Sequence, residues 1–245
     1  ERGSRNFADL EADISWLMYH DLGHANDFFP PARWSSLSLN NSPLETINLP
    51  SITPDSDALA SVYPLRSDEM HKLAQVNYGG DTATTGQKNT TADDVTDLFI
   101  PDLSTGFYNY YTTREDYATL FEKFMMKYRL DADSDIAIVS NNDNPDYNVT
   151  WGQRNRFNDP ALQDRVLFTV NRVLPEIDAA AIQATLPAPQ LMTAGNTWFE
   201  NLTIGSAAKS ADQMQWTPAL MRAQMRQDVR IPTSHKDNDL LTNQK

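Results

Sequence analysis

Two histidines four positions apart are the first residues of this chain whose spacing could do chemistry. They lie in the run His20-Asp21-Leu22-Gly23-His24-Ala25-Asn26-Asp27. On an α-helix this spacing stacks both imidazoles on one face, one turn apart, where two neutral rings can bind one zinc ion. The acid directly after the first histidine, Asp21, is placed to reach a metal-bound water and act as a general base. The pattern therefore predicts a Zn²⁺ site with His20 and His24 as ligands.

A catalytic zinc ion needs a third protein ligand, with water in the fourth position. The chain contains no cysteine, so it has no thiol nucleophile and no disulfide framework, and its candidate ligands are histidines and carboxylates. The remaining histidines, His71 and His235, have no partner at ligand spacing. The sequence also has no glycine-rich phosphate loop, no Gly-x-Ser-x-Gly and no Rossmann fingerprint.

Two short segments resemble the gluzincin family of zinc metallopeptidases. Residues 20–27 are similar to the pattern His-Glu-x-Gly-His-Ala-x-Asp, with Asp21 where the family has Glu, so the motif is HDxxH in place of HExxH. Residues 115–121, Glu-Asp-Tyr-Ala-Thr-Leu-Phe, are similar to the third-ligand helix pattern Glu-x-[Phe/Tyr]-Ala-Glu-x-Phe. The pairing is closest to the group that includes the catalytic domain of anthrax lethal factor.

This resemblance implies a zincin-like domain that hydrolyses peptide bonds with a metal-activated water. The zinc ligands that it implies are His20, His24 and Glu115. Asp21 takes the general-base position. In this family a tyrosine seven residues before the third ligand stabilises the oxyanion, and Tyr108 stands at that offset. Tyr110 and Tyr111 are the local substitutes if the loop is shifted.

Three features depart from the family pattern. Asp21 is one methylene shorter than the usual Glu. Thr119 stands where the ligand helix has its second Glu, and Glu122 is the nearby acid that could support a ligand histidine in its place. The stretch between His24 and Glu115 is long and contains residues 30–106, a segment rich in Pro, Ser and Asn at its start.

Alternative functions stay open at this point. A zinc-binding but inactive relative would share the ligands and lack turnover because of Asp21. An HD-type metal phosphohydrolase would use His20-Asp21 as its core, but it needs a further histidine upstream, and no histidine precedes His20. A non-catalytic helical binding module would bury the two histidines as core residues and use Glu115 in a helix cap.

The elements that must position these residues can also be predicted. Residues 5–27 have helical periodicity, with an apolar stripe that would face a core or the floor of a cleft: Phe7, Leu10, Ile14, Leu17, Met18 and Leu22. A second helix is predicted over 112–130. Two caps compete at its start, Thr112 with Glu115 or Thr113 with Asp116, and the second leaves Glu115 free to face inward.

The whole chain is predicted to be α+β and mainly helical, a zincin-like metallopeptidase domain with a long irregular insertion. Residues 1–231 form the single domain, in which 30–106 is an insertion or lid, and 232–245 form a polar tail. Further helices are expected over 68–76, 159–174, 176–186 and 218–229, and short strands over 136–139 and 147–151.

Composition limits the partners. The net charge is −13 and the pI is about 4.6, which argues against nucleic acid and against anionic membranes. No apolar run is long enough for membrane insertion. We therefore expect a peptide or protein substrate. An acidic, cysteine-free chain that starts at Glu1 without an initiator Met is compatible with a periplasmic or secreted protein whose targeting segment has been removed.

Overall fold

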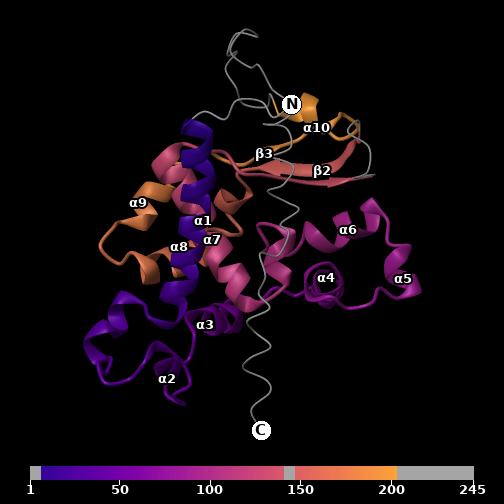
Figure 1. The fold of residues 1–245 in the computed structure, drawn as a ribbon. Coiled ribbons are helices and arrows are strands. Elements are labelled where there is room, and N and C mark those ends of the chain that lie inside the picture. Colours follow the sequence, from indigo (N-terminus) through magenta and orange to yellow (C-terminus); the bar gives the residue numbers. More distant parts are fainter. Residues whose placement is uncertain (1–6, 141–146, 203–245) are drawn as a thin grey trace. The chain divides into compact units, whose positions relative to one another are not determined.

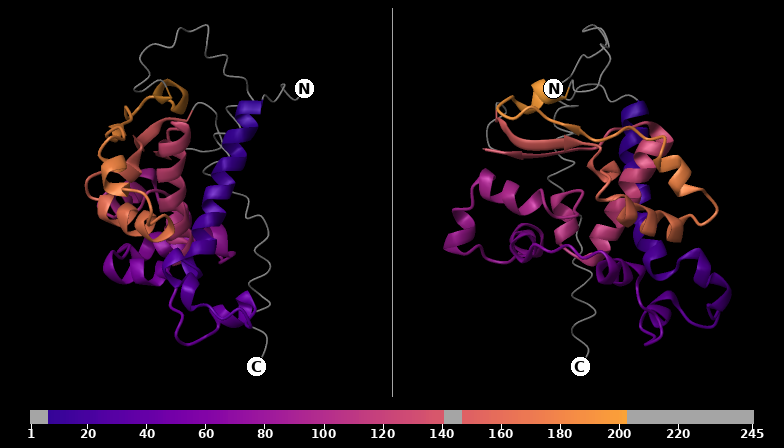
Figure 2. Two further views of the ribbon diagram at one scale, coloured as in Figure 1. Left: turned by 90° about the vertical axis from the view of Figure 1, so that its left-hand side faces the viewer. Right: turned by 180° about the vertical axis from the view of Figure 1, so that it is seen from behind.

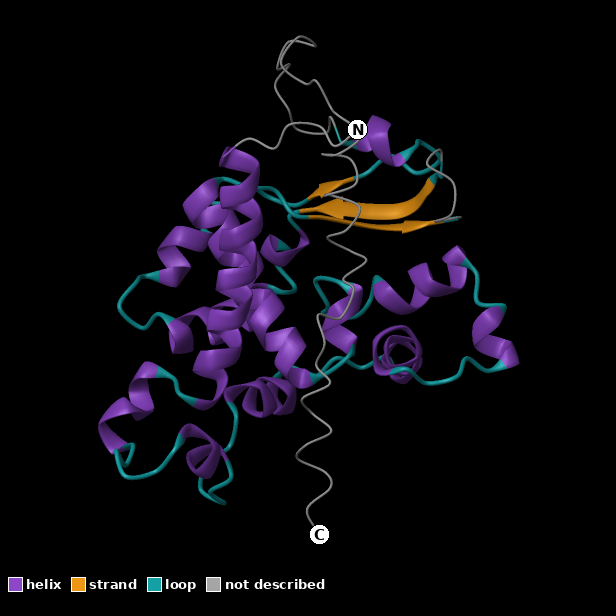
Figure 3. Ribbon diagram, in the orientation of Figure 1, coloured by secondary structure: helices purple, strands orange, loops and turns teal. Residues whose placement is uncertain are grey.

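Helix α7 (Thr113–Leu130) is the centre of the fold (Figure 1). The computed structural model describes residues 7–140 and 147–202, which all lie in one compact unit. Within it α7 is buried on nearly every side from Glu115 to Lys127. Its aromatic and aliphatic side chains form the main core with α8 (Gln163–Val173). The predicted class, α+β and mainly helical, is confirmed (Figure 3).

Helix α1 (Phe7–Phe28) runs alongside α7. The two backbones approach most closely at Gly23, where an added Cβ would lie 2.7 Å from the Ala118 Cα atom. The turned view shows α1 at the edge of the described helices (Figure 2). No helix in the described ranges is both long enough and apolar enough to cross a membrane.

The predicted burial of the α1 apolar stripe is wrong. Its large side chains are 43–57% exposed: Leu10, Ile14, Leu17, Met18 and Leu22. The Phe7 side chain lies outside the described part. The face that packs on α7 carries smaller or polar residues instead, among them His20, Gly23 and Asp27, all of which are buried. Hydrophobic periodicity located this helix but indicated the wrong face.

The sheet is small and antiparallel, with strand order β1-β2-β3. Strand β1 (Asp135–Val139) pairs with β2 (Val149–Arg154), and β2 pairs with the two-residue β3 (Gln190–Leu191). The two predicted strands are therefore confirmed in position, with β2 shifted toward the C-terminus by two or three residues. A bulge between Ile138 and Val139 ends the regular pairing.

Residues 30–106 were predicted to be an irregular insertion, but they are built mostly of short helices. In chain order these are η1 (Pro31–Ser36), α2 (Pro43–Ile47), α3 (Asp55–Val62), α4 (Asp68–Ala74), the π-helix η2 (Gln75–Gly79), α5 (Thr85–Lys88) and α6 (Ala92–Phe99). Helices α2, α4, α5 and α6 each follow a Ser or Thr whose hydroxyl accepts from the backbone N–H three residues further on. Helix α3 packs against α7 and α8, and α6 packs against the sheet. The helix predicted over 68–76 is confirmed as α4 and the start of η2. The other short helices were missed, because they have too few turns for a visible apolar period.

The remaining described elements follow the predictions approximately. Helix α8 begins at Gln163 because Asp159 to Leu162 form a turn, closed by the Leu162 N–H donating to the Asp159 carbonyl at 2.8 Å. Other short elements are η3 (Phe107–Tyr110), η4 (Arg156–Asn158), α9 (Ala179–Gln183) and α10 (Trp198–Asn201). The predicted helix over 218–229 and the tail over 232–245 lie outside the described residues.

Candidate metal centre

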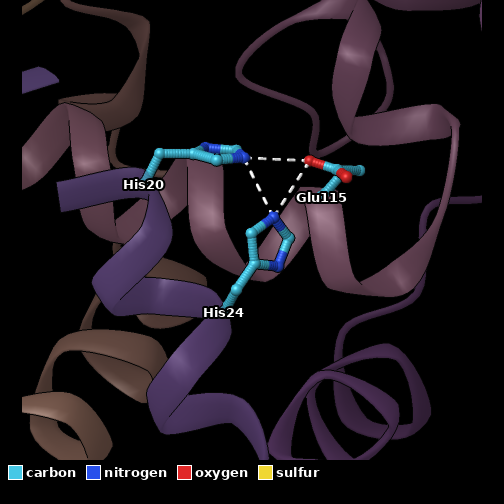
Figure 4. Close-up of side chains that lie close together, drawn as sticks. All are labelled: His20, His24 and Glu115. Atoms are coloured by element: carbon cyan, nitrogen blue, oxygen red, sulfur yellow. Dashed lines mark hydrogen bonds and ion pairs between the residues drawn. The ribbon is translucent and has the colours of Figure 1, made fainter. Parts of the chain in front are cut away.

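Three side chains from α1 and α7 converge on one point (Figure 4). Nε2 of His20 lies 3.0 Å from Nε2 of His24 and 3.0 Å from Oε2 of Glu115. The third edge of the triangle, from His24 Nε2 to Glu115 Oε2, is 3.3 Å. These residues are the one group in the described ranges whose ligand atoms could hold a metal ion. The three predicted ligands are therefore brought together across 95 residues of sequence.

The donor set and its spacing fit zinc. Two imidazole nitrogens and one carboxylate oxygen are a known three-ligand set for catalytic zinc. Ligand atoms about 2.0–2.2 Å from a tetrahedral centre are about 3.3–3.6 Å apart, close to the observed edges of 3.0–3.3 Å. His20 and Glu115 are buried, whereas the His24 side chain is 25% exposed. The site is therefore closed on the side of α7 and reaches solvent beside His24.

Helix packing sets the distance between the two ligand-bearing helices. Gly23 lies between the two histidines in sequence, and Ala118 lies three residues after Glu115. Their close contact allows the imidazoles on α1 to reach carboxylates on α7. The missing side chain of Gly23 makes room for the backbone of α7.

Glu115 is the third residue of α7, where the helix dipole favours a carboxylate. The Thr112 hydroxyl caps the helix by accepting from the Glu115 N–H at 3.2 Å, so the first of the two predicted caps is the one formed. The Glu115 carboxylate does not complete a capping box but turns to the histidines. Burial raises the pKa of this carboxyl, but its hydrogen bonds and charge interactions with His20 and His24 outweigh burial and hold the pKa well below its ordinary value.

Glu122 orients the first histidine. Its Oε2 lies 2.8 Å from Nδ1 of His20, and its Oε1 accepts from the indole N–H of Trp16. A carboxylate can only accept, so this contact assigns the proton of His20 to Nδ1 and directs Nε2 to the centre. Carboxylate–histidine pairs of this kind fix metal ligands in place. The role expected of Glu122 is thus supported, whereas Trp16 was missed, although it stands one helical turn before His20.

Thr119 does not take the place of the family's second Glu. It lies between Glu115 and Glu122 on the same helix, and its hydroxyl is buried without a hydrogen-bond partner in the described part of the chain. Threonine is too short to reach an imidazole across the helix interface. Glu122, one turn further along, supplies the carboxylate that this position lacks.

Tyr108 lies near the centre, with its ring centroid 6.3 Å from that of His20. Tyr78 packs edge-on against it at 4.8 Å, and Tyr111 stacks on it at 5.9 Å. Tyr110 is fully buried and donates to Asp102 at 3.1 Å, which excludes it as a substitute for Tyr108.

The loop that carries Tyr108 is anchored from α4 and η2. Nδ1 of His71 lies 2.8 Å from the Tyr110 carbonyl oxygen, and the Gln75 amide donates to the Tyr111 carbonyl at 2.8 Å. These contacts give His71 a structural role that its isolation in the sequence did not indicate.

Asp21 is exposed and is not part of the group that converges on the centre. As the residue after His20, it lies about 100° around the helix from that ligand and off the face that packs on α7. Its role as a base stays a prediction.

No protein-family model, no curated protein and no solved structure matches this chain. The resemblance to gluzincins therefore rests on the two short sequence segments and on the residues that they place together.

Proposed function

We propose that this chain is a zinc-dependent hydrolase that cleaves peptide bonds with a metal-activated water. The observation that carries the proposal is the triangle of His20 Nε2, His24 Nε2 and Glu115 Oε2, with edges of 3.0–3.3 Å. The ligand types, the open side at His24 and the resemblance to the gluzincin pattern all support this reading.

The proton assignment of His20 favours a cation over two ordinary core histidines. A His20 ring with a single proton, donated from Nδ1 to Glu122, has its lone pair on Nε2, 3.0 Å from an oxygen of Glu115, whereas a ring protonated on both nitrogens donates to both glutamates. Two electron-rich atoms at this distance, in a buried site, need a positive charge between them. A proton can serve one such pair, whereas a metal ion serves all three atoms at once.

Each residue then has a distinct task. When zinc is bound at such a site, it lowers the pKa of a water molecule and polarises a carbonyl group. His20, His24 and Glu115 would hold the ion, and Glu122 would keep His20 in the required orientation. Asp21 would accept the proton of the attacking water and pass it to the leaving amine. The Tyr108 hydroxyl donates a hydrogen bond to the substrate carbonyl oxygen as it gains negative charge.

The other candidate functions have less support. An HD-type phosphohydrolase would have an aspartate among its ligands, and the metal-binding group of the described residues contains none. An inactive zinc-binding relative differs from the proposal only in the reach of Asp21, and turnover separates the two.

The test is peptide cleavage measured together with metal content. We expect the purified chain to cleave members of a quenched-fluorescent peptide library, to lose this activity to a chelator, and to regain it with one equivalent of zinc. Asp21→Ala should keep its zinc and lose turnover, whereas the control Asp93→Ala, at an exposed acid on α6, should keep both. Asp21→Glu should hold or raise the rate. Zinc binding without cleavage by wild type or Asp21→Glu would favour the inactive relative.

A further inference from the structure

Helix α1 carries a row of large apolar side chains that are about half exposed. We call it the α1 stripe: Leu10, Ile14, Leu17, Met18 and Leu22, which are 43–57% exposed. Their spacing places them on one face of the helix, opposite the face that packs on α7. The turned view shows α1 itself at the edge of the described helices (Figure 2). Continuous apolar surfaces of this kind mark interaction sites.

Acidic residues accompany the α1 stripe. Glu11, Asp13 and Asp21 are exposed, and α1 contains no lysine or arginine from Phe7 to Phe28. Asp21 stands one turn after Leu17, on the same face of the helix. The surface therefore combines apolar side chains with negative charge. A complementary partner must present apolar side chains among basic ones.

We propose that the α1 stripe is a docking surface for a cationic amphipathic peptide segment, whose apolar side chains cover Ile14 and Leu17 while its Lys or Arg side chains pair with Glu11 and Asp13. A helix laid along a helix, with anchors every three or four residues, is a common way to fill such a surface. The site does not require the metal, so it can be present whether or not the chain hydrolyses peptides.

Charge argues against the other occupants. A second copy of this chain would bring Glu11, Asp13 and Asp21 against the same three acids, and like charges in contact are repulsive. Nucleic acid and anionic membranes carry the same sign as the surface, and the whole chain has a net charge of −13. A basic peptide is the class that gains from both the apolar area and the acids.

Fluorescence anisotropy tests this proposal on the full chain carrying His20→Ala, so that cleavage cannot remove the probe. The probe is a short labelled peptide of Leu and Lys with helical periodicity, and its control replaces Lys with Glu. We expect saturable, salt-sensitive binding of the Lys peptide and none of the Glu peptide. Adding Ile14→Gln and Leu17→Gln should weaken binding about 10- to 30-fold, because each removes apolar surface that the bound peptide would cover.

Controls keep the outcome decisive. Leu39→Gln makes the same change at a fully exposed leucine outside α1 and should leave binding unchanged. Glu11→Gln with Asp13→Asn should weaken binding and reduce its salt dependence without touching the apolar residues, which covers the case in which the apolar variants fail to fold. Absence of binding, equal binding by all variants, or equal binding of the Glu peptide would overturn the proposal. Dimerisation that Leu17→Gln abolishes would also overturn it, because the occupant would then be a second copy.

Discussion

Helices α1 and α7 share one candidate metal site but have opposite surroundings. Helix α7 is buried on nearly all sides, and its aromatic residues are the core of the fold. Helix α1 is buried on one face only, and that face carries the tryptophan, histidines and glycine that meet α7. Helix α7 therefore provides most of the core, and α1 is held against it by a polar network and one close backbone contact. We expect substitutions in the α7 core to reduce folding stability and substitutions on the inner face of α1 to weaken zinc binding.

The largest expected effect is on metal binding. His20→Ala removes one of three ligands and the partner of Glu122, and should weaken zinc binding by at least about a thousandfold, or about 4 kcal/mol. Competition with a chromophoric chelator measures this affinity. Asp21→Ala, the next residue on the same helix, should leave it unchanged. Tight zinc binding by His20→Ala would show that the metal is not bound by these three residues.

The next effect is on folding stability and separates the two helices directly. Phe121 on α7 is 1% exposed, and Phe121→Ala should reduce the free energy of unfolding by about 3–5 kcal/mol. Leu17 on α1 is half exposed, and Leu17→Ala should cost less than about 1 kcal/mol. Urea denaturation compares the two. Similar losses would mean that the α1 stripe is covered as well as the core.

The close contact between α1 and α7 can be tested by adding one methyl group at Gly23. Gly23→Ala places a Cβ 2.7 Å from Ala118 Cα, so the helices must separate. We expect a loss of about 1–3 kcal/mol in unfolding free energy, together with weaker zinc binding. Gly86→Ala is the matched control, since its nearest contact would be 3.9 Å away, and it should leave both quantities nearly unchanged. Normal zinc affinity in Gly23→Ala would show that the ligands do not depend on this contact.

The smallest effects on zinc binding are expected at Glu122 and Trp16, which support His20 without binding the metal themselves. Glu122→Gln keeps the shape but loses the carboxylate that assigns the His20 proton, and should weaken zinc binding about 10- to 100-fold. Trp16→Phe removes only the N–H donor to Glu122 and should have a smaller effect in the same direction. The paired titrations check this order. A larger effect from Trp16 than from Glu122 would contradict it.

Much of the site could be predicted from sequence because it depends on spacing within helices. The pair His20 and His24 follows from one helical turn, and Glu115 follows from the resemblance of its own helix. Glu122 was predicted as a residue that supports a ligand histidine because it lies on the same helix as Glu115, two turns further on. Trp16 could not be inferred, because its role depends on a contact with a residue 106 positions away.

The fold was predicted less completely than the site. The long helices α1 and α7 and the strands β1 and β2 have clear periodicity, so their positions were predicted to within a few residues. Among the short helices of residues 30–106 only the one at 68–76 was predicted. The capping boxes that start α2, α5 and α6 are local patterns that could have indicated these helices. Their packing on α7 and the sheet is not visible in local patterns. The buried face of α1 was predicted wrongly because its inward residues are polar and small. An apolar stripe predicts burial only when nothing else in the helix makes stronger contacts.

The most direct test of the central claim is a crystal of the purified chain, grown with zinc, with data collected on both sides of the zinc absorption edge. The account predicts one anomalous peak about 2.0–2.2 Å from Nε2 of His20, Nε2 of His24 and an oxygen of Glu115. The peak should disappear in crystals of Glu115→Gln with His24→Ala. A peak elsewhere, or none while the three side chains bond directly to one another, would contradict it.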